Sequence, residues 1–238
     1  MVGRDSASDY PPAAVSVTSV GGTFVELDSE TILKLGPDLI LAAEITPIEY
    51  VAELEGHELT VFWLANPLEL EGLYTNLSLV GQLVGREEEA DVLIEELEAR
   101  VAAVDAALAD LPDEERPTVF YELDGSDPSA IWTAGRGTFV SELIRRAGGI
   151  NIGEILDGEF GQLSVEELII QDPDIILLGD AKFIDIETVP DRAGWSGLTA
   201  IQENQYYPFD PDLLSRPGPR LVDALEELAR LLHPELFE

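Results

Sequence analysis

The chain contains no cysteine, which excludes disulfides, thiolate metal sites and cysteine nucleophiles. It has only two histidines, His57 and His233, too few for a histidine-based metal site. His233 stands in a Leu-His-Pro sequence, where we expect it to end a helix. No apolar run approaches the roughly 18 residues of a membrane span. No basic segment followed by an apolar one opens the chain, so we expect no signal segment within it.

Positive charge is also scarce. Lys and Arg total 13 against 48 Asp and Glu, a net charge of −35, and the lysines are only Lys34 and Lys182. Such a field repels phosphate backbones and anionic membrane surfaces, which argues against nucleic acid as a partner. The balance suits a protein kept soluble in high salt or a secreted protein, and an acidic lineage composition explains it equally well.

One pattern occurs twice along the chain. Residues 27–42 read LDSETILKLGPDLILA, and residues 163–178 read LSVEELIIQDPDIILL. Each copy predicts a helix capped by Asp28 or Ser164, and in the second copy Glu167 completes a capping box. A proline then ends the helix, and the apolar run that follows predicts a strand buried on both faces. The repeat therefore indicates two similar α/β lobes.

A long helix is predicted between the two copies. Residues 86–111 contain neither Gly nor Pro, and their apolar residues recur at steps of three and four. Gly85 separates this stretch from an amphipathic segment at 68–84. We therefore predict an α/β protein of two doubly wound lobes joined by a single long helix. The expected domains are residues 1–85, a connecting helix at 86–111, and residues 112–238.

Motifs for catalysis or phosphate binding are missing. Gly135-Arg136-Gly137-Thr138 precedes a predicted helix and offers N–H groups to an anion, but it lacks the spacing and lysine of a P-loop and fits a tight turn before a helix cap better. There is no Gly-x-Ser-x-Gly elbow, and no acidic calcium loop occurs. We therefore predict no catalytic residues, no metal ligands and no cofactor.

Aromatic and charged residues lie at the ends of the predicted strands. In doubly wound folds, ligands bind beyond the carboxyl ends of the strands. The predicted ligand-binding residues are Tyr10, Phe24, Glu44, Trp63, Glu122, Trp132, Phe183 and Arg216. Arg216 precedes Pro217-Gly218-Pro219, which holds its backbone stiffly, so we expect it to contact an anionic or carbonyl-rich part of a ligand.

Over almost its whole length the chain resembles the solute-binding proteins of ABC importers for vitamin B12, ferric siderophores and haem. The resemblance rests on several segments in order: SDYPP at 8–12, both copies of the repeat, LVGREEEADVLIEELEARV, WTAGRGTFVSELIRRAGGINI and SRPGPRLVDALEELARLLHPE. It implies two α/β lobes with a rigid connecting helix. It also implies a siderophore, corrinoid or haem ligand, ABC permease subunits as partners, a monomer, and an extracytoplasmic location.

The chain departs from this family in its first lobe. The resemblance places a signal segment and a βα unit before Val2-Gly3, so we expect the first lobe to lack its opening unit. The vitamin B12 binders carry aromatics where this chain has Ala7 and Ala43, with Phe24 as the nearest substitute. Cobalamin is therefore a less favoured ligand, and the shortage of histidine disfavours free Zn or Mn.

The family also implies how the protein docks. Its members present one acidic residue from each lobe to arginines of the permease. Glu49 stands near that position in the first lobe; in the second, Ser215 takes it, with Asp212 as the neighbouring acid. Two other functions stay open: an α/β enzyme of chelatase-like or hydrolase type, and a truncated binding protein with a scaffolding role.

Overall fold

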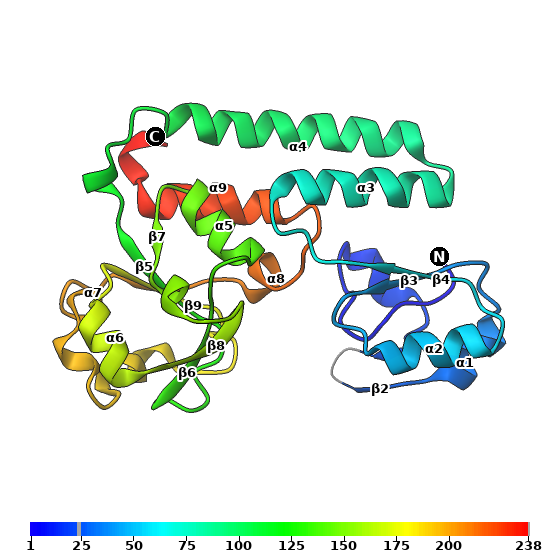
Figure 1. The fold of residues 1–238 in the computed structure, drawn as a ribbon, viewed down its shortest axis with the longest axis horizontal. Coiled ribbons are helices and arrows are strands. Elements are labelled where there is room, and N and C mark those ends of the chain that lie inside the picture. The colour runs from blue at the N-terminus through cyan, green and yellow to red at the C-terminus, as the bar shows by residue number, and fades with distance from the viewer. Residues whose placement is uncertain (23–24, 238) are drawn as a thin grey trace. The chain divides into compact units, whose positions relative to one another are not determined.

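The computed structural model describes residues 1–22 and 25–237 and divides them into two compact units, Met1–Asn66 and Pro67–Glu238. The sequence predicts a first lobe ending at residue 85, whereas the structure groups residues 67–85 with the second unit. The reason is tertiary: α3 (Leu70–Val84) packs along α4 (Glu87–Ala107), and α4 packs against α9 (Leu221–Leu232). Figure 1 shows these helices side by side.

The first unit is a small α/β layer. In chain order it contains β1 (Gly21–Gly22), β2 (Val25–Leu27), α1 (Ser29–Leu35), β3 (Ile40–Ala43), α2 (Ile48–Gly56) and β4 (Val61–Leu64). Strands β3 and β4 are parallel, so both end at the same edge. The prediction that β3 is buried on both faces is wrong, because Leu41 is 43% exposed; only Ala42 is buried.

The second unit is built on a parallel sheet. Its strands lie in the order β10 (Tyr206–Pro208), β9 (Ile175–Leu178), β5 (Thr118–Glu122) and β7 (Ile150–Asn151), and every neighbouring pair is parallel. The remaining elements are β6 (Ala130–Ala134), α5 (Phe139–Arg146), β8 (Phe160–Ser164), α6 (Val165–Gln171), α7 (Thr199–Gln202) and α8 (Pro211–Leu214). Parallel strands alternating with helices confirm the predicted doubly wound α/β class.

Alternate residues of β5 point to opposite faces of this sheet, and each face has its own core. Val119 and Tyr121 pack with α3, α4, α5 and α9 in one hydrophobic cluster. Phe120 packs in the other with Ile131 of β6, Leu168 of α6 and Trp195. The side chain of Glu122, two residues after Phe120, lies on the second of these faces.

Both copies of the repeat form the predicted capped helix followed by a strand. The side chains of Asp28 and Ser164 cap α1 and α6 by accepting hydrogen bonds from Thr31 N and Glu167 N. The second half of the capping box does not form, because the Glu167 carboxylate accepts instead from Gln171. Strand β9 is buried at all four positions, as predicted.

The long helix is shorter than its sequence allows. Helix α4 ends at Ala107, and Leu111 N bonds Leu108 O in a tighter turn. Pro112 explains this end, because the residue before a proline is disfavoured in the α conformation. Leu97, Val101, Val104 and Leu108 of the predicted stripe are buried. Among the described residues, no helix has the length and apolar character to cross a membrane.

Candidate functional site

Three neighbouring strands of the second unit end at one edge of its sheet. Because β5, β9 and β10 are parallel, the segments that follow Glu122, Leu178 and Pro208 all begin at this edge. We call this region the ligand edge. It is where doubly wound folds bind small molecules, and it is where the sequence predicts four of the eight ligand-binding residues.

Two of those residues are exposed aromatics. Trp132 of β6 is joined to the segment after β5: Trp132 N donates to Asp124 O, and Leu123 N donates to Trp132 O. Its side chain is 42% exposed. Phe183, in the segment after β9, is 85% exposed. Large apolar groups left open beside a sheet edge are a common feature of binding surfaces.

Charged residues form a chain of ion pairs at the same edge. Lys182 Nζ lies 2.7 Å from Asp210 Oδ1 and 3.2 Å from Asp212 Oδ2, and Arg216 lies 2.9 Å from Asp212 Oδ1. The side chains of Lys182 and Arg216 remain 51% and 33% exposed. Hydrogen bonds from Lys182 raise the pKa of that ammonium and, against the effect of burial, lower the pKa of Asp210.

Glu122 is not a surface residue, and its predicted contact with a ligand is corrected by the structure. Its side chain is 0% exposed and accepts two hydrogen bonds from the Arg192 guanidinium, at 2.5 and 3.0 Å. Arg192, just after the 3-10 helix Ile186–Asp191, lies over the ring of buried Trp195, 4.6 Å from its centroid. A strand-end carboxylate can face inward when such a partner reaches it. Sequence analysis missed Arg192, whose only signal is a scarce cation three residues before a tryptophan.

Burial raises the pKa values of two adjacent residues of β5, Tyr121 and Glu122. It raises the pKa of Glu122 to about 7, against the opposing effect of Arg192, and the nearby charge of Asp180 adds to the rise. Burial also raises the pKa of Tyr121 to about 12. An ionisable group with a strongly shifted pKa beside a binding edge is a candidate for function.

The first unit holds the other predicted ligand-binding residues. Glu44 follows β3, and its carboxylate accepts a 2.5 Å hydrogen bond from Asn66 N after β4, so these two strand ends are joined. Trp63 lies within β4 and is 41% exposed, and Tyr10 is 59% exposed. Phe24 lies outside the described residues.

The two predicted docking residues differ in their surroundings. Glu49 is exposed in the first turn of α2. Asp212 begins α8 but pairs with both Lys182 and Arg216, which offset its charge.

Two sequence motifs have purely structural roles. Thr138 caps α5 by accepting from Ser141 N, and Gly137 adopts φ +83 before it, as expected for a turn and helix cap. His233 ends α9: its N–H donates to Ala229 O, and its buried ring contacts Gly148 O at 3.3 Å. Among the residues that the structure describes, no group of three acids or histidines could hold a metal ion.

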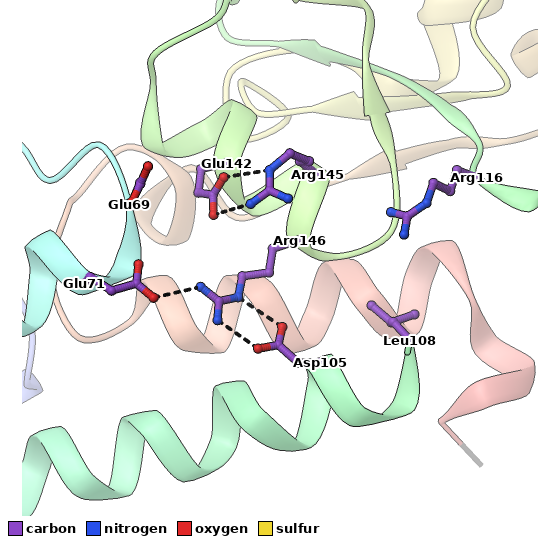
Figure 2. Close-up of a pocket in the computed structure, with 8 residues that line it drawn as sticks. All are labelled: Glu69, Glu71, Asp105, Leu108, Arg116, Glu142, Arg145 and Arg146. Atoms are coloured by element: carbon purple, nitrogen blue, oxygen red, sulfur yellow. Dashed lines mark hydrogen bonds and ion pairs between the residues drawn. The ribbon is translucent and has the colours of Figure 1, made fainter. Parts of the chain in front are cut away.

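A pocket of about 470 Å³ lies at the other end of the sheet, beside Arg116, which precedes β5. Figure 2 shows that its walls are ion pairs: Arg146 of α5 bonds Asp105 of α4 and Glu71 of α3, and Arg145 bonds Glu142. These contacts tie three helices together. We therefore assign this pocket a structural role.

Comparison with known proteins agrees with this geometry. A relative from Bacillus subtilis, named an uncharacterized ABC transporter substrate-binding lipoprotein, is 28% identical over all of this chain and 74% of its own length. A Halobacterium salinarum relative named a cobalamin-binding protein is 30% identical over 98% of this chain, which spans 63% of that relative. The apo structure of the periplasmic heme-binding protein RhuT from Roseiflexus superimposes with a TM-score of 0.86 at 28% identity, covering 99% of this chain and 90% of RhuT.

The family model described as periplasmic binding protein matches residues 1–213. The match spans both compact units, including the ligand edge up to Asp212. The chain belongs to this family of periplasmic binding proteins.

Proposed function

We propose that the protein is the solute-binding component of an ABC importer that captures a bulky iron chelate, corrinoid or haem and delivers it to a permease without catalysis. The observation that supports this proposal is the ligand edge, where segments carrying exposed Trp132 and Phe183 and the cations Lys182 and Arg216 leave the ends of parallel strands. Aromatic faces suit a flat macrocycle, and cations suit its carboxylates or phosphate. In this role the protein acts as a monomer outside the cytoplasmic membrane.

The relatives support this range of ligands. The halobacterial relative is named for cobalamin and RhuT for heme. We propose that the ligand rests on the edge of the second unit. Tyr10, Phe24, Glu44 and Trp63 are proposed as ligand-binding residues from their positions in the sequence.

Ligand capture predicts a thermal shift. Cyanocobalamin, haemin or a ferric siderophore that binds should raise the Tm in proportion to the logarithm of its concentration above Kd. Phe183→Ala should weaken binding of that probe about tenfold or more, because burying a phenylalanine side chain is worth about 1.5–3 kcal/mol. Arg216→Ala should also weaken binding if an anionic group is recognised.

Two matched variants control this experiment. Ile170→Ala removes another exposed apolar side chain, 73% exposed on α6, and Arg86→Ala removes an arginine that is 69% exposed just before α4. Both should leave affinity unchanged. If no probe raises the Tm, or if Phe183→Ala and Ile170→Ala behave alike, the ligand edge is not the binding surface.

Docking predicts a separate effect at Glu49. Glu49→Arg should abolish binding to the cognate permease at low salt, where charge contacts are least screened, while leaving ligand affinity intact. Glu55→Arg makes the same charge change on an exposed position of the same helix and should retain most of the binding. If wild type and Glu49→Arg bind the permease with equal affinity, Glu49 has no role in docking.

A further inference from the structure

Three ionisable side chains are buried together directly beneath the ligand edge. Glu122 and Asp180 are 0% and 7% exposed, and the side chain of Arg192 is 9% exposed. With both carboxyl groups ionised, the cluster carries one uncompensated negative charge. A net charge in such surroundings is costly, so the cluster needs either another cation or a proton.

The hydrogen bonds show which group is missing. Both Glu122 oxygens accept from Arg192, and Asp180 Oδ2 accepts from Gly125 N at 2.7 Å. Asp180 Oδ1 is buried with no donor among the described atoms. Gly125 brings the two carboxyl groups close together, because its N–H donates to Asp180 Oδ2 while a Cβ added to it would lie 2.4 Å from Glu122 Oε1. Since two carboxylates offer only acceptors, a hydrogen bond between them requires a proton.

The cluster also joins the two segments that carry the exposed aromatics. Gly125 belongs to the segment after β5, which bonds Trp132 through Asp124. Asp180 belongs to the segment after β9, which carries Phe183. A Cβ added at Gly125 would lie 2.4 Å from Glu122 Oε1 and 3.1 Å from Arg192, so this segment closes tightly over the carboxyl group.

We propose that one proton, shared between the carboxyl groups of Glu122 and Asp180, completes this buried cluster and holds the segments after β5 and β9 where they present Trp132 and Phe183 to the ligand. Glu122, Asp180 and Arg192 are thus positioning residues. When the proton is lost, the two buried carboxylates repel each other. This repulsion weakens the hydrogen bond from Gly125 N to Asp180 that holds the two segments together.

We expect this proton to be released near neutral pH. Burial raises the pKa of Glu122 to about 7, and the charged groups that bear on it are Arg192, after the 3-10 helix Ile186–Asp191, and Asp180, after β9. Tyr121 packs on the other face of the sheet, but its hydroxyl lies against Gly179 and interacts electrostatically with Asp180. The two histidines lie elsewhere, His57 in the first unit and His233 against Gly148. Because the folded pKa lies above the unfolded one, the stabilisation is present at low pH and is lost as pH rises toward and through about 7.

The first test needs no ligand. Carbon-13 NMR titration of the glutamate carboxyl groups, with the Glu122 signal assigned from its loss in Glu122→Gln, should show one glutamate titrating near pH 7. Asp180→Asn keeps an acceptor for Gly125 N and supplies a permanent donor to Glu122, so it should remove that step. Glu166→Gln removes one exposed carboxylate from the same unit and should leave the step in place. A Glu122 signal that titrates below pH 5 in the wild type overturns the proposal.

The second test rests on the proposed function. The affinity for the probe that binds, cyanocobalamin or haemin, should fall about fivefold from pH 6 to pH 8, at the low end of typical coupling between sites. For Asp180→Asn, the affinities at pH 6 and at pH 8 should be nearly equal. Titration of the probe itself affects the wild type and the variant alike, so the comparison removes its contribution. An equal pH dependence in both proteins overturns the positioning role. If no probe binds at any pH, the proposed function fails while the NMR titration still decides whether the proton is shared.

Discussion

Arg192→Met is expected to lower the free energy of unfolding by about 3–5 kcal/mol at pH 7, the usual cost of removing one partner from a buried ion pair. The variant leaves Glu122 without either of its hydrogen bonds from the guanidinium and removes the cation from the face of Trp195. Urea unfolding followed by tryptophan fluorescence measures the change.

The destabilisation caused by Arg192→Met should depend on pH. Arg192 lowers the pKa of Glu122 against burial, so removing it raises that pKa further above the unfolded value. Stability that depends on neutral Glu122 is present at low pH and is lost as pH rises. The destabilisation should therefore be smaller at pH 5 than at pH 7.

Two variants separate this effect from a general loss of charge. Arg145→Met removes an arginine that is 64% exposed and paired with Glu142, and it should cost no more than about 1 kcal/mol. Replacing the whole pair, in Arg192→Met with Glu122→Met, should recover much of the loss because no unpaired group remains on Glu122. If the single and double variants are equally unstable, packing of the arginine stem accounts for the effect.

Local sequence signals were sufficient for most of the secondary structure. The caps at Asp28 and Ser164 and the proline after each helix act within a few residues, so the capped helix and following strand of both copies could be predicted. The boundary of the first unit is different. Gly85 does end α3, as a glycine in the left-handed conformation, but only the packing of α3 on α4 assigns that helix to the second unit.

The candidate site was predictable only in part. The parallel order of β5, β9 and β10 places Trp132, Phe183 and Arg216 at one edge, and strand-end positions already indicate this. The inward orientation of Glu122 depends on Arg192, 70 residues away in a segment without helical or strand periodicity. No local pattern in a single sequence encodes such a pairing. The exposure of Leu41 likewise depends on what covers β3.

The stability of the protein is expected to increase strongly with salt. The acids outnumber the cations by 35, so folding into a compact state brings like charges together. On the exposed face of α4, Asp91, Glu95 and Glu98 follow at intervals of four and three residues, which places neighbours about 5–6 Å apart. The Debye length is about 10 Å at 0.1 M and about 3 Å at 1 M, so this repulsion persists at 0.1 M and is screened at 1 M.

Screening by salt also weakens the exposed ion pairs, which lowers stability. The excess of acids over cations makes the net effect of salt on stability positive. Pairs such as Lys34–Glu30 and Arg86–Glu89 are largely exposed, and each is worth about 0.2–1 kcal/mol at most. Salt weakens the attraction to only 13 cations, whereas it weakens the mutual repulsion of 48 acids. The buried Glu122–Arg192 pair is shielded from salt by its burial.

We therefore expect the Tm to rise by about 6–12 °C between 0.1 and 1 M KCl, which corresponds to about 3 kcal/mol for a chain of this size. NaCl at equal ionic strength should give the same rise. Glu95→Gln removes the central acid of the row on α4, so it should raise the Tm in low salt, and this advantage should shrink toward zero at 1 M. A Tm that is flat or falls with KCl would mean that repulsion between the acids does not limit stability. A rise that Glu95→Gln leaves unchanged would place the dominant repulsion outside the α4 row.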